Sequence, residues 1–99
     1  MQHHVYFWLK AEHKTDEARA AFENGLNLCK GVSHVASGGW GKPAATADRA
    51  VTDKSWDYSL YLSFDNVEDH NAYQVDPDHH TFVAEHGHRS EKVIVMDVE

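Results

Sequence analysis

The stretch "WDYSLYLSFD", residues 56 to 65, alternates apolar and polar side chains with a period of two. One face would carry Trp56, Tyr58, Leu60, Leu62 and Phe64. The opposite face would carry Asp57, Ser59, Tyr61 and Ser63. This alternation is typical of a strand with one buried face, as in an antiparallel sheet covered on one side.

Three further segments have the aromatic and β-branched composition of strands: residues 3–12, 32–42 and 92–98. The first, "HHVYFWLKAE", carries apolar or aromatic side chains on each of its two faces, so we expect both faces to be covered. The last, "KVIVMDV", is apolar on both faces, which predicts an interior position in the sheet.

Three segments have helical signals: residues 15–31, 66–73 and 76–87. Thr15 can cap the first helix, and Asp76 followed by Pro77 suits the start of the third. Gly87 suits its end.

The predicted order β-α-β-β-α-α-β over residues 1–99 favours a single α+β domain. An antiparallel four-stranded sheet with helices on one face is the economical arrangement. The uncovered face would then expose Tyr6, Trp8 and Tyr61 to water. Two copies packed sheet against sheet would remove that exposure, so we expect a homodimer.

The composition is that of a globular chain, with 41% hydrophobic and 25% charged residues. A formal net charge of -7 argues against nucleic acid and against an anionic membrane as partners. Cys29 is the only cysteine, which excludes an internal disulfide and suits a reducing compartment. The short apolar run near the first residues lacks the features of a signal peptide. We therefore expect a cytoplasmic protein.

The stretch "YQVDPDHHTF", residues 73 to 82, is rich in titratable side chains. Helix capping alone accounts for its aspartates. A helix N-terminus also lowers the pKa of a nearby histidine, which would keep His79 neutral and able to accept a proton. Paired with Tyr73, such an imidazole suits proton removal next to a carbonyl group. The alternative is that His79 simply packs between helix and sheet.

A metal site is the other hypothesis for the histidines. The third predicted helix has no H-x-x-x-H pair, and the chain has no second cysteine. The adjacent pairs His3-His4 and His79-His80 diverge in direction on strands and helices alike. We therefore expect neither a metal nor a cofactor.

The chain resembles the stress-responsive A/B barrel domain, or Dabb, family of dimeric ferredoxin-like α/β barrels. The resemblance rests on residues 3–10, 40–42 ("WGK"), 58–64, 72–82 and 91–99. Its most specific part is the Y-x-x-D-P-x-H pattern within residues 72–82. The family implies a homodimer in which two four-stranded sheets form a barrel with helices outside.

The family does not imply one activity. One of its members is a cyclase that closes a linear polyketide by aldol condensation in a pocket between helices and sheet. By this resemblance its catalytic histidine falls on His79 and its assisting tyrosine on Tyr73. A pocket histidine of that enzyme falls on His3, and another falls on Tyr58, where this sequence departs from the enzyme.

Three functions follow as hypotheses. The first is a dimeric binding module for a small apolar or aromatic molecule beside His79. The second is a cofactor-independent lyase or cyclase with His79 as general base and Tyr73 as its partner, and with His3 and Tyr58 orienting substrate. The third is a purely structural, stress-related dimer.

Overall fold

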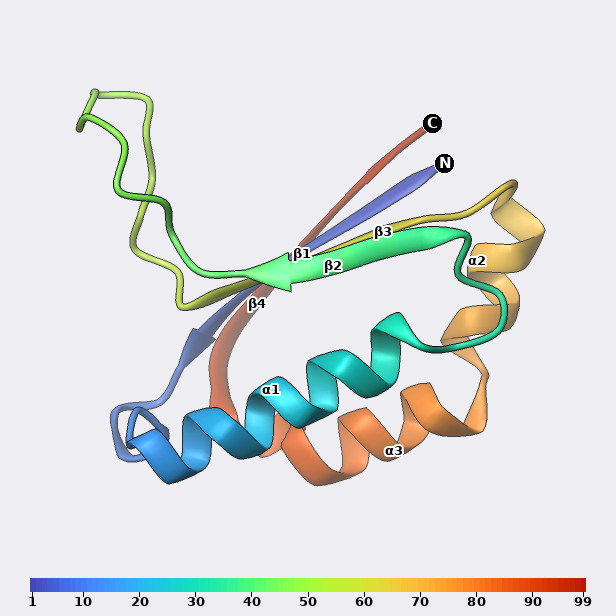
Figure 1. The fold of residues 1–99 in the computed structure, drawn as a ribbon, viewed down its shortest axis with the longest axis horizontal. Helices are drawn as coiled ribbons and strands as arrows, with labels where there is room; N and C mark the ends of the chain where they lie inside the picture. The colour runs from blue at the N-terminus through green and yellow to red at the C-terminus, as the bar shows by residue number, and fades with distance from the viewer.

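The computed structural model describes all residues 1–99 and has seven main elements in the predicted order (Figure 1). They are β1 (Gln2–Leu9), α1 (Asp16–Lys30), β2 (Ser37–Gly41), β3 (Tyr58–Ser63), α2 (Val67–Gln74), α3 (Pro77–His86) and β4 (Ser90–Val98). Two short 3-10 turns precede α1 and β4: η1 (Ala11–His13) and η2 (Gly87–Arg89).

Each α-helix begins at a residue whose side chain accepts a hydrogen bond from the first helical turn. These N-caps are Thr15, Asn66 and Asp76. Pro77 occupies the first turn of α3, where its missing N–H leaves no hydrogen bond unmade. Local sequence therefore sets where the helices start, because a capping oxygen stabilises N–H groups that have no partner inside the helix.

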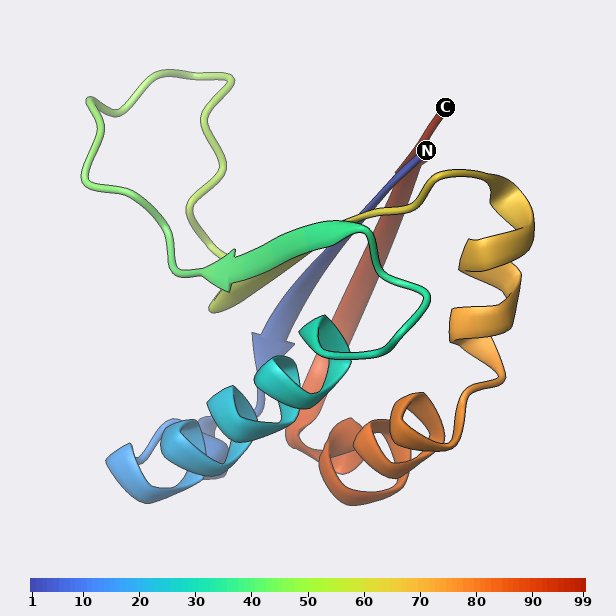
Figure 2. The same cartoon turned by 45° about the vertical axis from the view of Figure 1, so that its right-hand side comes forward.

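The four strands form one antiparallel sheet in the order β2-β3-β1-β4. β1 is central and pairs with β3 and β4, so His3 lies opposite Leu62 on one side and Asp97 on the other. All three α-helices lie on one side of the sheet, and the two chain ends lie together (Figures 1 and 2). This is the predicted α+β ferredoxin-like fold.

The core lies between the helices and the sheet. It is formed by 13 buried hydrophobic side chains, which come mainly from the inner faces of β1 and β3 and from α1. Phe22 of α1 has its ring 5.2 Å from that of Phe7 and 5.8 Å from that of Phe82 of α3, measured between centroids. These aromatic contacts join the two long helices to the central strand.

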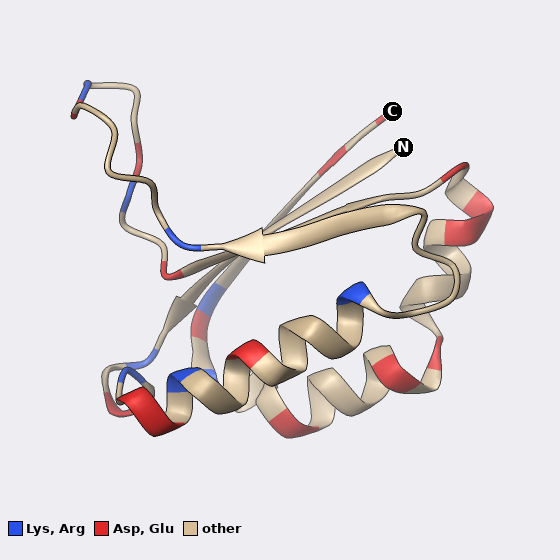
Figure 3. Ribbon diagram, viewed as in Figure 1, with Lys and Arg blue, Asp and Glu red and all other residues tan.

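Charged side chains avoid most of the sheet. β1, β2 and β3 contain no Lys, Arg, Asp or Glu, whereas acidic residues mark the helices and the loops (Figure 3). The surface charge behind the net value of -7 therefore lies largely away from both sheet faces.

The prediction for Trp56 was wrong. We expected it beside Tyr58 and Leu60 on the inner face, but β3 begins only at Tyr58. Trp56 packs instead on Tyr6 of the open face, with ring centroids 5.3 Å apart. The indole N–H of Trp56 donates to the carbonyl of Asp53, so Trp56 belongs to the loop before β3 and does not follow the alternation of the strand.

The prediction of an interior position for the last strand was also wrong within one protomer, because β4 is an edge strand. Its two apolar faces have separate surroundings. Val93 and Val95 are about half exposed on the helix side (49% and 50%), whereas Ile94 and Met96 lie on the open face. The apolar character of β4 thus marks two surfaces that the helices of this chain leave uncovered.

Gly25 sets how closely α1 and α3 approach. A Cβ atom built on Gly25 would lie 2.6 Å from Cδ2 of His86 and 2.9 Å from Cδ2 of Phe82. Both distances are below van der Waals contact, so the two helices pack backbone against ring at this position. Only glycine allows that spacing.

We predict that Gly25→Ala lowers the free energy of unfolding by about 1–3 kcal/mol, because the methyl group overpacks the interface between α1 and α3. Helix propensity alone would favour the alanine by about 1 kcal/mol. Urea unfolding at a fixed protein concentration measures the change. Gly31→Ala is the control, since its nearest neighbours would lie at an ordinary 3.5 Å. Equal stability of the two variants would contradict the packing argument.

Candidate functional site

A cavity of about 410 Å³ lies between the sheet and helices α2 and α3. Its apolar walls are Val5, Phe7, Leu60, Phe82, Val83, Val93 and Val95. Four of the nine histidines of the chain also line it: His3, His70, His79 and His86. The cavity therefore combines hydrophobic walls with imidazoles, a combination found in small-molecule sites.

Tyr73 and His79 come together as the sequence predicted. Tyr73 lies in the last turn of α2 and His79 in the first turn of α3, and the short connection between the helices places their rings 4.9 Å apart at 68°. Tyr73 belongs to the buried core and is only 1% exposed. Burial is the main cause that raises the pKa of Tyr73 above its usual range, so the phenol stays protonated.

His79 is a neutral imidazole at pH 7. Burial lowers its pKa from the ordinary value, and the nearby imidazoles of His80 and His3 lower it further. Its Nδ1 atom is buried and makes no hydrogen bond. His79 can therefore accept a proton, but no neighbouring side chain orients its ring as the third member of a catalytic triad would.

His3 is the imidazole that a carboxylate does orient. Its Nδ1 donates to Oδ1 of Asp97 across the β1–β4 pair at 2.5 Å, and the residue is only 4% exposed. Burial lowers the pKa of His3, although the hydrogen bond to Asp97 opposes this effect. The predicted position of His3 on the cavity side of β1 is therefore the observed one.

Three cavity residues escaped the sequence analysis as site candidates: His70, His86 and Asp97. The ring of His70 lies 4.9 Å from that of His3. His86 packs on Phe82 and Phe22, and its Nδ1 is buried without a hydrogen-bond partner. Register could have found Asp97, because the antiparallel pairing of the first and last strands decides which residue faces His3.

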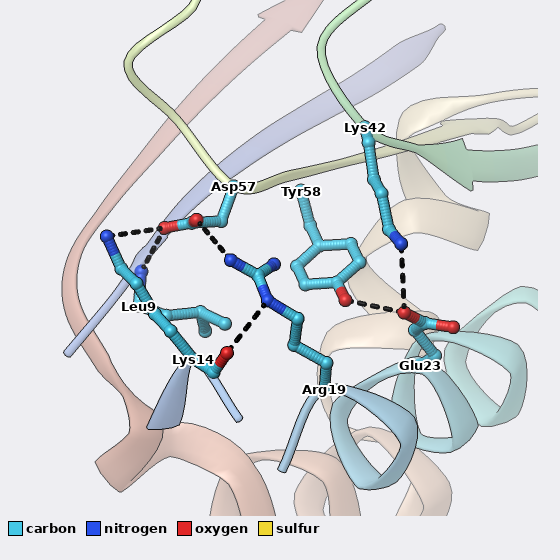
Figure 4. Close-up of polar contacts among 7 residues, drawn as sticks. All are labelled: Leu9, Lys14, Arg19, Glu23, Lys42, Asp57 and Tyr58. Carbon is cyan, nitrogen blue, oxygen red and sulfur yellow. Dashed lines mark hydrogen bonds and ion pairs between the residues drawn. The ribbon is translucent and has the colours of Figure 1, made fainter. Parts of the chain in front are cut away.

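The structure places Tyr58 outside the cavity. Position 58 pairs with Phe7, near the far end of β1 from His3. Its hydroxyl donates to Oε2 of Glu23 at 2.5 Å, and the guanidinium of Arg19 lies beside its ring (Figure 4). Burial and the bond to Glu23 raise the pKa of Tyr58 to about 12.

A second polar cluster next to Tyr58 ties the start of β3 to α1. Asp57 accepts hydrogen bonds from the backbone N–H of Leu9 at 2.7 Å and from Arg19 at 3.1 Å, and Lys14 lies 3.8 Å from it (Figure 4). Because Asp57 joins the backbone of Leu9 to side chains of Lys14 and Arg19, the arrangement of this cluster is that of a structural link between elements.

The chain belongs to the stress responsive A/B barrel domain (Dabb) family, whose model matches residues 1–99. No curated protein matches it. Among solved structures, it is similar to a protein from Arabidopsis thaliana at 19% identity and a TM-score of 0.80, covering 99% of this chain and 92% of that one.

Two further similar structures show the range of proteins with this fold. A dimeric ferredoxin-like protein of unknown function from Thermobifida fusca is 18% identical, with a TM-score of 0.76 over 96% of this chain and 85% of that one. A hydroxynitrile lyase from Passiflora edulis is 18% identical, with a TM-score of 0.77 over 96% of this chain and 87% of that one. At these identities the likeness establishes the fold.

None of the helices has the length and apolar character needed to cross a membrane.

The buried histidines predict that stability falls in mild acid. Burial lowers the pKa of His79 and His86 in the folded chain, whereas the unfolded chain protonates near pH 6.5. As the pH falls from about 7.5 to about 5, the unfolded state binds protons that the folded state resists, so the free energy of unfolding decreases. Urea midpoints at the two pH values measure the loss.

His86→Leu should show a smaller difference between the two pH values, because the variant has lost one such group. His34→Ala is the control, since His34 is exposed and should leave the difference unchanged. A wild-type midpoint that rises or stays constant in acid would contradict the prediction.

Proposed function

We propose that this Dabb-family chain is a homodimeric binding module for a small apolar or aromatic molecule, held in the cavity beside His79. The observation that carries the proposal is the cavity itself. Its volume of about 410 Å³ lies within the range of roughly 300–1,000 Å³ typical of ligand sites. Its walls are valine, leucine and phenylalanine side chains.

The polar groups of the cavity restrict the ligand further. At pH 7 the imidazoles of His3, His79 and His86 are neutral, because burial lowers the pKa of each. A neutral imidazole accepts or donates one hydrogen bond but does not attract a strong anion. The cavity therefore suits a largely apolar molecule with a hydroxyl or carbonyl group.

The mouth of the cavity is also apolar. Val83, Val93 and Val95 line the cavity, and each is about half exposed (53%, 49% and 50%). Apolar side chains gathered at an opening favour entry of a hydrophobic ligand, because binding removes their surface from water.

Several observations support a homodimer formed through the open face of the sheet. That face exposes Tyr61 and Met96, and Tyr6 and Trp8 are half-buried on it. Similar structures from Thermobifida fusca and Bacteroides fragilis are described as dimeric. A second copy would cover both the open face and an edge strand, which otherwise invites unspecific pairing.

We expect native mass spectrometry of untagged protein to show a dimer carrying a discrete extra mass. Val95→Trp should abolish that mass and weaken the binding of the uncharged dye N-phenyl-1-naphthylamine by at least about tenfold, because the indole fills the cavity. Val75→Trp is the matched control, since Val75 is 71% exposed and lies outside the cavity. A dimer without extra mass, whose affinity for the dye is unchanged by Val95→Trp, would favour the purely structural alternative. A monomer would contradict the proposed homodimer.

A second function, a cofactor-independent lyase or cyclase, is favoured by the pairing of a proton acceptor with a proton donor. Neutral His79 would take a proton from the carbon next to a carbonyl group. Tyr73, which stays protonated, would donate a hydrogen bond to the carbonyl oxygen. His3, oriented by Asp97, would hold the substrate. The Passiflora hydroxynitrile lyase is an enzyme with a similar fold.

Once the bound molecule is identified, kinetics separate the two functions. For an enzyme, His79→Ala and Tyr73→Phe should lower kcat by roughly 100-fold or more with little change in ligand affinity. Tyr58→Phe is the control, a tyrosine of the same protein that lies outside the cavity. For a binding module, no turnover is detectable, and His79→Ala changes affinity alone.

A further inference from the structure

Two imidazoles and a carboxylate from three separate elements meet at one end of the cavity. They belong to His3 of β1, His70 of α2 and Asp97 of β4, and one potential ligand atom of each lies within 4.8 Å of the others. We propose that these three residues bind a divalent transition-metal ion of the zinc or ferrous type. This site goes beyond the binding of an apolar molecule proposed above.

His3 is held in place for this role. The residue is 4% exposed, and its ring packs edge-on to Phe64 and Tyr73 with centroids 6.4 and 6.0 Å away. Asp97 accepts the hydrogen bond of its Nδ1. A buried imidazole next to a carboxylate is the arrangement common around protein-bound metals, where the carboxylate is a ligand itself or orients the ring.

His70 presents an unused nitrogen to the cluster. Its Nδ1 lies 3.2 Å from the side-chain oxygen of Asn71. Nε2 is buried and has no hydrogen-bond partner. Since a buried polar atom without a partner is costly, a cation at this position would remove the cost.

The donor set decides the class of ion. Two imidazole nitrogens and one carboxylate oxygen suit zinc or ferrous iron, which are commonly bound by two histidines and one acidic residue. Calcium and magnesium prefer oxygen ligands alone. Cys29 is not available as a softer ligand, because its side chain is buried in the core beside Tyr73.

The geometry of the cluster needs small shifts of its side chains before it can hold an ion. Ligand atoms around a tetrahedral zinc lie about 3.4 Å apart, because each bond is about 2.0–2.1 Å long. Here the separations reach up to 4.8 Å. Asp97 can move most easily, since its side chain is 41% exposed on an edge strand. Oδ1 of Asp97 lies only 2.5 Å from Nδ1 of His3, too close for two ligands of one ion, so it would move away from that nitrogen. The buried His3 would stay in place, and His70 would approach the ion.

The remaining coordination positions would face the cavity, because His3, His70 and Asp97 all contribute to its lining. Water or a hydroxyl or carbonyl group of a bound molecule could fill them. We expected no metal because the sequence has no histidine pair at helical spacing and no second cysteine, whereas tertiary structure brings residues 3, 70 and 97 together.

The test is a zinc titration of untagged protein from which a chelator has removed all metals. Isothermal calorimetry and competition with a chromophoric zinc indicator measure the binding. We expect one zinc per protomer, with no comparable binding of magnesium or calcium. Asp97→Asn and His70→Ala should each weaken zinc binding by at least about tenfold, because even residues that only orient a ligand contribute that much. Cobalt in place of zinc should give a visible spectrum that both variants lose.

His34→Ala is the matched control, because His34 is exposed and does not belong to the cluster. It should leave both affinity and stoichiometry unchanged. Circular dichroism checks that each variant is folded. If His70→Ala is unstable, Asp97→Asn still tests the site, because Asp97 is at an exposed position. Zinc binding that is absent, or that survives both cluster variants, would overturn the proposal. The dye titration of Val95→Trp reports on the apolar cavity separately.

Discussion

The antiparallel pairing of β1 with both β3 and β4 is the constraint on which the rest of this structure depends. As the central strand, β1 sets the register of its neighbours and so decides which side chains share a face. Its inner residues, from His3 to Leu9, supply the floor of both the core and the cavity. A shift of one residue would move His3 to the open face and leave Asp97 without its partner.

The cavity exists because the three helices do not cover the whole inner face of the four-stranded sheet. Phe22 and Leu26 of α1 fill the space over β3 and β1, where burial is complete. Towards β4 the helices leave a gap bordered by Val93 and Val95. The close approach at Gly25 belongs to the same arrangement, since it draws α3 towards α1 and away from the edge strand. Incomplete coverage thus leaves a cavity between helices and sheet without any loop to form it.

Burial in that cavity gives its histidines their chemical character. Water would allow imidazoles to be charged in mild acid, but desolvation lowers the pKa of His3, His79 and His86. Neutral imidazoles can accept a proton, form a hydrogen bond with a hydroxyl or carbonyl group, or bind a metal ion. Which role each one takes depends on its neighbours. His3 has Asp97 and His70 beside it, whereas His79 has the aromatic ring of Tyr73.

Local sequence by itself determined the order of elements, the starts of the first and third helices and the inner face of β3 from Tyr58 onward, because capping and side-chain alternation act over a few residues. It also paired Tyr73 with His79, since only a short turn separates them. The tertiary structure alone decided that β4 lies at an edge, that Trp56 packs on the open face and that Tyr58 bonds Glu23 away from the cavity. It alone joined His3, His70 and Asp97, because strand register and helix packing relate residues that no local pattern connects.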